Sequence, residues 1–302
     1  MEHLAAEVPD PVNLDVGING GRVDRKPRLN PIRVSLVGFL VLAMASWAYI
    51  LANGDSGFTD VFKLETWKGA ASFLGELAGN GKEGTPAFLQ MGEWGKAGKL
   101  AYETLAMSVL AMGIAGAGVL ITFLPAARNV AMGDLAASRS PLWKGLYYVV
   151  RGFFIFTRGI PELIIAMIVI FAFSPGILPG AIALGLHNYG ILGKLSAEVV
   201  ENLDTRPARA LRTSGAGAFQ VLAYGILPQA LPQFLTYLLY RWEVVIRTTI
   251  VVGLVSAGGL GRELRLDMSF FRYTNVALLL IWYLILVMFV DLASMYLRRL
   301  AR

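Results

Sequence analysis

Apolar residues gather in six long blocks along the chain, separated by polar and charged stretches. The blocks cover residues 34–51, 100–124, 149–173, 177–200, 232–255 and 274–297. A helix that crosses a bilayer needs about 20 mostly apolar residues, which is close to the length of each block. The pattern therefore predicts an all-α membrane protein with six transmembrane helices.

Lysine and arginine flank these blocks asymmetrically. There are four basic groups. One precedes the first block, one lies between the second and third blocks, one lies between the fourth and fifth, and one follows the sixth. They are Arg22, Arg25, Lys26, Arg28 and Arg33; Arg128, Arg139 and Lys144; Arg206, Arg209 and Arg212; and Arg298, Arg299 and Arg302. In a six-span arrangement all four groups lie on one side, and short basic flanks stay in the cytoplasm. Both termini are therefore predicted to be cytoplasmic, although the outer loop after the fifth block is basic too.

The blocks also divide the chain into parts. Residues 1–33 are polar, with three prolines in residues 1–30, which predicts a mostly disordered cytoplasmic arm. Residues 52–99 are expected outside the membrane, where the apolar spacing of residues 57–78 predicts an amphipathic helix on the interface. Residues 100–297 form the main helical core.

Composition narrows the class of protein. The 302 residues are 56% hydrophobic and 16% charged, whereas a soluble domain is about 25% charged. The sequence has no cysteine, which excludes a disulfide scaffold, a thiol catalyst and a cysteine zinc site, and its two histidines form no metal cluster. The net charge of +6 lies beside the apolar blocks, which favours a role in orientation over nucleic-acid binding.

Catalytic motifs are missing from the sequence as well. It contains no Gly-x-x-x-x-Gly-Lys-[Ser/Thr] phosphate loop, nucleophile elbow, metal-ligand cluster or paired-carboxylate site. We predict that the chain is not an enzyme and carries no cofactor of its own.

Charged residues inside the third and fourth blocks mark a candidate path. Arg158 and Glu162 are four residues apart around Pro161, so they would share one helix face as an ion pair at the cytoplasmic boundary or as part of a path. In the fourth block, His187 shares a face with the pair Lys194 and Glu198, which would reach the inner interface. His187 and its neighbour Asn188 lie deeper and are the better path candidates.

The fifth block contains Arg241, Glu243 and Arg247. Counted from Pro232, Arg241 lies roughly 13 Å and Arg247 roughly 22 Å along a helix. The four-residue spacing predicts a Glu243–Arg247 pair and leaves one positive charge. The unpaired arginine would face water, a partner subunit or an anionic substrate. A purely structural role for it is weighted equally with a functional one.

A glycine-rich run ends the fifth block. Ser256, Gly258, Gly259 and Gly261 would allow tight turns, a gate, or anion binding through backbone N–H groups.

The segment 203–228, expected in the cytoplasm, has a sequence that predicts ordered structure, which is unusual for a loop between two spans. Pro207 suits a first helical turn, residues 208–214 favour a helix, and Gly215 ends it. Arg206, Arg209 and Arg212 form a basic stripe on that helix. The stripe would dock a cytoplasmic partner or touch anionic lipid.

This segment resembles the coupling-loop signature of ATP-binding-cassette importer permeases, EAA-x3-G-x9-I-x-LP. The aligned positions are Ala210, Leu211, Gly215, Leu227 and Pro228. The sequence departs from the signature at Arg209, which replaces its glutamate, and at Gly225, which replaces its isoleucine. The resemblance covers about residues 100–297, starting near Glu103-Thr104-Leu105, and implies that Thr205, Arg206, Arg209 and Arg212 also contact the ATPase.

Within that family the sequence is most similar to the phosphonate-type branch. The similarity rests on residues 158–163 (RGIPEL), 193–198 (GKLSAE), 224–234 (YGILPQALPQF), 240–243 (YRWE) and 257–261 (AGGLG). Methionine-type permeases share the first and last of these segments without the YRWE character.

The resemblance implies the permease of a bacterial inner-membrane importer that works by alternating access. The implied partners are a second permease, two ATPase subunits that bind ATP and Mg, and an extracytoplasmic binding protein. The implied cargo is phosphonate, phosphite or a related phosphorus oxyanion. An amino acid such as methionine is the alternative cargo, and an ion-coupled secondary transporter or a structural membrane protein are the alternative classes.

Overall fold

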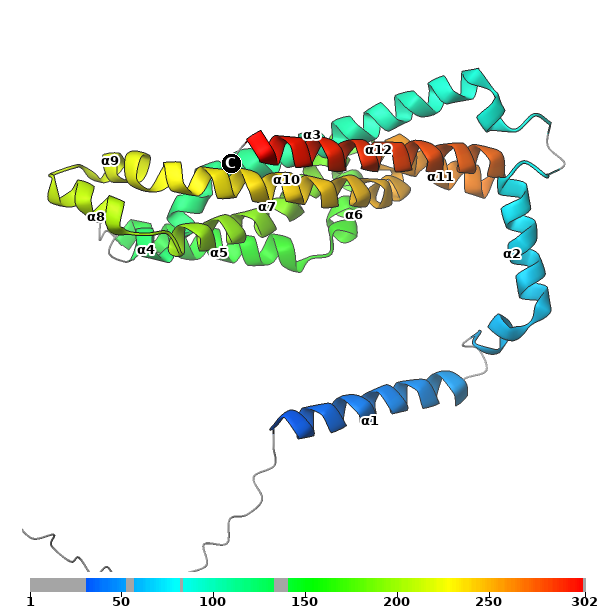
Figure 1. Cartoon of the computed structure of the whole chain (residues 1–302), viewed down its shortest axis with the longest axis horizontal. Coiled ribbons are helices and arrows are strands. Elements are labelled where there is room, and N and C mark those ends of the chain that lie inside the picture. Colours follow the sequence, from blue (N-terminus) through cyan, green and yellow to red (C-terminus); the bar gives the residue numbers. More distant parts are fainter. Residues whose placement is uncertain (1–30, 53–56, 82–83, 133–140, 301–302) are drawn as a thin grey trace, which may run out of the picture. The chain divides into compact units, whose positions relative to one another are not determined.

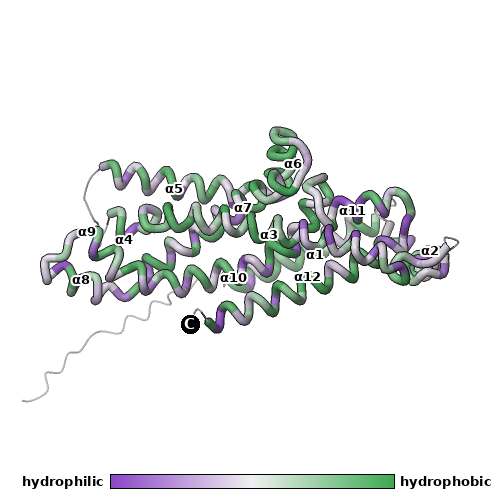
Figure 2. Tube along the Cα trace, turned by 90° about the horizontal axis from the view of Figure 1, so that it is seen from above, coloured by the Kyte–Doolittle hydropathy of each residue, from purple (hydrophilic) through white to green (hydrophobic). Residues whose placement is uncertain are grey.

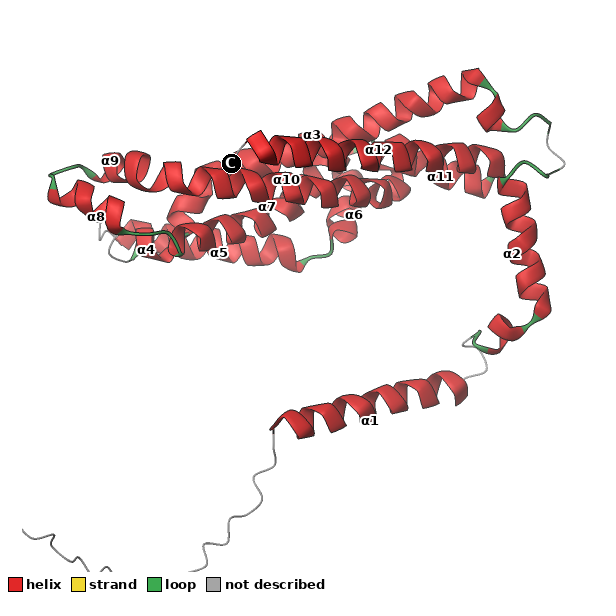
Figure 3. Ribbon diagram, in the orientation of Figure 1, coloured by secondary structure: helices red, strands yellow, loops and turns green. Residues whose placement is uncertain are grey.

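A computed structural model describes residues 31–52, 57–81, 84–132 and 141–300. Every regular element in these ranges is a helix, as the sequence predicts (Figure 3). The predicted N-terminal arm lies mostly outside the described residues. The chain divides into two compact units, residues 1–69 and 70–302, which are described separately.

The first unit contains one long apolar helix, α1 (Pro31–Ala52). It covers the predicted block 34–51, and its side chains are exposed along nearly the whole length, as on a helix surrounded by lipid. The predicted amphipathic helix is interrupted. It divides into η2 (Thr59–Phe62) and α2 (Leu64–Leu77), because Lys63 between them adopts an extended backbone. The boundary between the units falls within α2, so residues 70–77 belong to the second unit.

The second unit is a helical bundle built around α3 and α7. Its remaining elements pack on these two helices or connect them (Figure 1). After α2, the elements of this unit are, in chain order, η3 (Ala87–Leu89), α3 (Met91–Ala126), α4 (Arg128–Ala131), α5 (Pro141–Gly159), α6 (Glu162–Phe173), α7 (Ile177–Glu201), α8 (Arg206–Thr213), α9 (Ala218–Gln220), the π-helix η4 (Val221–Ile226), α10 (Leu227–Val252), the π-helix η5 (Gly253–Ala257), α11 (Gly259–Ser269) and α12 (Tyr273–Leu300).

Helix α7 occupies the centre because it contacts α3, α5, α6 and α10. Glycines allow this close approach. A Cβ atom on Gly190 would lie 2.2 Å from Thr157 Oγ1 and 2.8 Å from the Phe154 carbonyl oxygen, and one on Gly193 would overlap the Phe154 ring. Small residues at helix contacts are typical of membrane bundles, where packing replaces the hydrophobic effect as the driving force.

The third apolar block is broken, which corrects the single helix predicted over 149–173. Helices α5 and α6 meet at an angle of 96°. Pro161 lies at the break, has no N–H to donate, and disfavours helical backbone at Ile160. The carbonyl oxygen of Ile160 instead lies 3.1 Å from His187 Nδ1 of α7.

The described helices give partial support to six spans. Three helices, α1, α3 and α12, are long and apolar enough to cross a membrane, and the count rises to five if each of two bent pairs is one span. Helix α7 covers the predicted fourth block, but glycine and polar residues interrupt its apolar surface. Figure 2 shows apolar residues along most of the bundle helices, whereas α8 and the region around α2 are more polar. Six spans therefore remain a prediction.

The glycine contact generates a test. We expect Gly190→Ala to lower the midpoint of thermal unfolding in detergent, because overpacking a tight contact costs about 1–3 kcal/mol. Gly152→Ala is the matched control, since a Cβ atom on Gly152 of α5 would meet nothing within 4 Å. Equal midpoints for the two variants would contradict this account of the α5–α7 contact.

Candidate functional site

The segment between α7 and α10 forms a helix, as predicted. Helix α8 begins at Arg206, with Pro207 in its first turn, and the Asp204 carboxylate accepts a hydrogen bond of 3.0 Å from the Arg206 backbone N–H. Ala208 is buried, whereas Arg206, Arg209 and Arg212 are exposed. The basic stripe predicted from the spacing therefore lies on the outer face of α8.

Gly215 ends this helix, as predicted. Its φ of +84° is left-handed, a conformation that glycine adopts without strain. The Ala216 N–H donates to the Leu211 carbonyl oxygen, and the Gly215 N–H donates to that of Arg212, both at 3.0 Å. These two bonds form a Schellman motif, which satisfies carbonyl groups at the helix end.

Gly225, a departure from the importer signature, has a packing role. A Cβ atom there would lie 3.1 Å from Ala208 Cα and 3.2 Å from Leu211 Cδ1. Helix α8 therefore packs so closely against the π-helix η4 that any larger residue would require a small shift of α8. From η4 the chain continues directly into α10 at Leu227 and Pro228.

Two aromatic side chains beside α8 were missed by sequence reasoning. Phe219 is 80% exposed and Tyr224 is 73% exposed. Both follow α8 in the chain, Phe219 in α9 and Tyr224 in η4. Exposed aromatic residues after a basic helix are a signal that the sequence carries, and they form an apolar part of this surface.

The start of the segment is anchored by charges that sequence reasoning also missed. Glu201, the last residue of α7, forms an ion pair with Arg151 of α5 and accepts a 2.7 Å hydrogen bond from the Arg128 backbone N–H. Arg151 Nε also donates to the Ala126 carbonyl oxygen at 2.9 Å. The ends of α3 and α7 are thereby held to the middle of α5, next to the start of α8.

Three consecutive residues of α10 bind three different helices. Arg241 Nε donates to Asn188 Oδ1 of α7 at 2.6 Å, and Trp242 Nε1 donates to Ser108 Oγ of α3 at 3.1 Å. Glu243 forms an ion pair of 2.5 Å with Arg298 of α12. We call Arg241, Trp242, Glu243 and Arg247 with their partners the charged layer.

The predicted Glu243–Arg247 pair is wrong. Arg247 Nη2 instead contacts both carboxylate oxygens of Asp291 on α12, at 2.8 and 3.0 Å, and Glu243 pairs with Arg298. Partners on a packed helix thus replace the partner one turn away on the same helix. Asp291 is the acidic residue within the sixth apolar block, a signal that was visible in the sequence.

The two other expected pairs differ in outcome. Lys194 and Glu198 form an ion pair of 3.3 Å, which confirms the spacing argument. For Arg158 and Glu162 the shared helix face is wrong, because the break at Pro161 separates them. In the described part of the chain no ion pair joins these two residues.

The glycine-rich run packs against α3. Gly258 and Gly259 have φ angles of +97° and +64°. The Leu260 N–H donates to the buried Thr104 Oγ1 at 2.9 Å, and a Cβ atom on Gly261 would lie 2.1 Å from the Ile250 carbonyl oxygen. These glycines allow a close turn at the end of α10. A gate formed by Ser256, Gly258, Gly259 and Gly261 stays a prediction.

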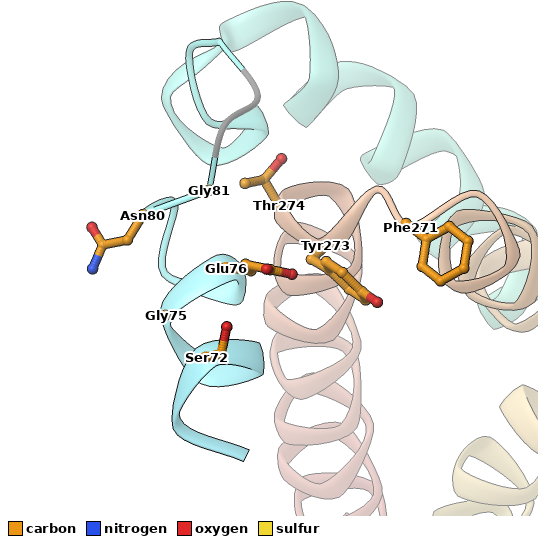
Figure 4. Close-up of a pocket in the computed structure, with 8 residues that line it drawn as sticks. All are labelled: Ser72, Gly75, Glu76, Asn80, Gly81, Phe271, Tyr273 and Thr274. Carbon is orange, nitrogen blue, oxygen red and sulfur yellow. The ribbon is translucent and has the colours of Figure 1, made fainter. Parts of the chain in front are cut away.

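A cavity of about 560 Å³ lies between the end of α2 and the start of α12 (Figure 4). Its lining residues are Ser72, Gly75, Glu76, Asn80, Gly81, Phe271, Tyr273 and Thr274. The Glu76 side chain points toward α12. None of the site residues predicted from the sequence lines this cavity.

The charged layer generates a second test. Replacing Asp291 by Arg would place two guanidinium groups together, so we expect the purified protein to unfold at a lower temperature. The double variant Arg247→Asp/Asp291→Arg restores opposite charges and is expected to recover most of the loss. A double variant no more stable than the single one would show that the pair makes no direct contribution.

Comparison with known proteins places these features in a family. Residues 129–302 match the model of the binding-protein-dependent transport system inner membrane component. The chain is 40% identical over 197 residues to the phosphite transport system permease protein PtxC of Stutzerimonas stutzeri, covering 65% of this chain and 68% of that protein. It is 36% identical over 168 residues to the phosphate-import permease protein PhnE of Mycolicibacterium smegmatis, covering 56% of this chain and 30% of that one.

A solved structure shows the same fold. The inward-facing MetNI methionine ABC transporter aligns with a TM-score of 0.56 and 21% identity, over 68% of this chain and 95% of the matched chain. At this identity the likeness concerns the fold alone, which is that of a type I ABC importer permease. The match over residues 129–302 shows that the chain belongs to the family of binding-protein-dependent transport system inner membrane components.

Proposed function

We propose that this chain is the transmembrane permease of an ATP-driven importer for a phosphorus oxyanion, phosphite or phosphonate. The observation that carries the proposal is the segment from Arg206 to Pro228. It presents an exposed helix ended by Gly215 at the importer spacing, in a chain related to permeases named for phosphite and phosphate.

The proposed arrangement in the bacterial inner membrane has six spans with both termini in the cytoplasm. Helix α7 is the fourth span, and α5 with α6 is a bent third span. This arrangement leaves α8 in the cytoplasm, where its basic stripe and the exposed Phe219 face a soluble partner.

The proposed complex contains a second permease, either a copy or a paralogue, and two ATPase subunits that bind ATP and Mg. An extracytoplasmic binding protein delivers the anion. Closure of the ATPases moves α8, and the motion passes to the bundle because α8 is continuous with α7 and α10 and Glu201 anchors its base to α3 and α5. The bundle then opens alternately outward and inward.

Arg158, Glu162, His187, Asn188, Arg241, Glu243 and Arg247 remain the proposed path residues. The contacts of the charged layer assign them unequal roles. Glu243 and Arg247 have charged partners on α12, and His187 lies beside the broken third span. Arg241 is therefore the strongest candidate for contact with an anion.

One measurement tests class and cargo together. ATPase activity of the purified complex in lipid is measured with its binding protein, either empty or loaded with phosphite, methylphosphonate or methionine. Stimulation by the two phosphorus oxyanions is the expected result. Stimulation by methionine alone would keep the importer and change the cargo, whereas failure of any ATPase to copurify would overturn the importer and favour a secondary transporter or a structural protein.

The coupling segment generates a third prediction. Gly215→Val places a β-branched residue at a φ of +84°, so we expect α8 to lose its C-terminal cap and the loaded binding protein to stimulate ATPase at least about tenfold less. The matched control is Gly217→Ala, because Gly217 has a φ of −69° and open space around its Cβ position. Normal stimulation in Gly215→Val, or equal loss in both variants, would contradict the role of Gly215.

A further inference from the structure

Three arginines of the charged layer have different partners. Arg247 contacts the Asp291 carboxylate and Arg298 contacts that of Glu243. In the part of the chain that the structure describes, the side chain that hydrogen-bonds Arg241 is the amide of Asn188. Two guanidinium groups are thus neutralised at short range, whereas the third keeps its positive charge.

Asn188 fixes the orientation of Arg241 without neutralising it. Asn188 is fully buried, and its Nδ2 donates to the Leu184 carbonyl oxygen at 2.8 Å, so its Oδ1 is directed at Arg241 Nε. A guanidinium group has five N–H donors. The bond to Asn188 uses the one on Nε, and no described protein acceptor takes those on Nη1 and Nη2.

An acidic residue acts on Arg241 from a greater distance. Glu162 lies at the start of α6 beside the broken span, and α6 contacts α10, so the Glu162 carboxylate attracts the Arg241 guanidinium at longer range. Among the described residues the two form no ion pair within 4 Å. Glu162 therefore offsets part of the charge while leaving the Nη edge open to another acceptor.

From this arrangement we infer that the Nη edge of Arg241 is a binding subsite for the transported oxyanion inside the bundle. Asn188 orients the guanidinium group, and Glu162 is the internal charge that competes with the anion. Two oxygens of a tetrahedral phosphorus oxyanion match the paired N–H groups of arginine. The inference rests on the proposed function, because it assumes that such an anion crosses this bundle.

The chemistry of the Asn188 amide explains why it, and not a carboxylate, is the partner of Arg241. An anion inside a low-dielectric bundle needs a compensating positive charge, and an arginine already paired with a carboxylate offers little net charge. An amide oxygen holds the guanidinium group in place and leaves that charge available. Asn188→Asp would convert Arg241 into a third neutralised arginine with almost no change in side-chain shape.

The test measures binding directly. Equilibrium dialysis with radiolabelled phosphite is carried out on the permease–ATPase complex in lipid nanodiscs without binding protein, and phosphite uptake with binding protein is measured in parallel. We expect Asn188→Asp to raise the Kd for phosphite roughly tenfold or more and to lower the uptake per ATP hydrolysed. Glu162→Gln removes the competing charge and is expected to lower the Kd.

The matched control is Gln233→Glu, which adds a carboxylate at an exposed position of the same helix α10 and should leave the Kd unchanged. An electrostatic role shifts the Kd for phosphite in opposite directions in Asn188→Asp and Glu162→Gln. Loss of packing would instead weaken phosphite binding in both variants. If the Asn188→Asp complex does not assemble, the change in the Kd for phosphite in Glu162→Gln alone tests the subsite.

Three results overturn the inference. The first is a wild-type complex that transports phosphite but binds none in dialysis, and the second is a Kd that neither variant changes. The third is competition by lipid. If added phosphatidylglycerol weakens phosphite binding to the wild-type complex but not to Asn188→Asp, a lipid headgroup occupies the subsite. A wild-type complex that neither binds nor imports any phosphorus oxyanion would instead refute the proposed function itself.

Discussion

The free energy needed to remove a guanidinium group from water is the constraint on which the arrangement of α10 depends. A charged side chain deep in a membrane bundle is costly, so each arginine must reach an acceptor on a neighbouring helix. Arg241 reaches α7, while Arg247 and the acid Glu243 both reach α12. These contacts restrict how α10 can rotate or slide between its neighbours, and the Trp242 bond to α3 adds a fourth helix to the same layer.

Helix α7 connects this layer to the end of the bundle at which α8 lies. Its glycines allow α5 to approach closely and Asn188 binds α10. Glu201 in its last turn binds Arg151 of α5 and the Arg128 N–H directly after α3. The chain enters α8 directly beyond this anchor, and returns from α8 through η4 into α10. A displacement of α8 therefore acts on both ends of the Arg241–Asn188 contact, because the two residues lie on the two helices that α8 joins.

The sequence predicted those features that depend on neighbouring residues. Apolar blocks located the helices, Gly215 located the end of α8, and a four-residue spacing located the Lys194–Glu198 pair. The sequence did not predict the bend at Pro161 or the ion-pair partners of Glu243 and Arg247. Proline allows either a kink or a break, and tertiary packing decides between them. An ion-pair partner on another helix depends on the rotation of both helices, which periodicity does not give.

Arg209 and Gly225, which depart from the coupling-loop signature, concern opposite faces of α8 and therefore have different consequences. Gly225 contacts the buried face at Ala208, so its small size sets how closely α8 packs on η4. An isoleucine at this position would require α8 to lie farther from η4. Arg209 is on the exposed face, where it leaves that packing unchanged and reverses the charge that the signature offers to its partner. The packing of α8 and the charge of its exposed face are thus controlled by separate residues, and one can change without the other.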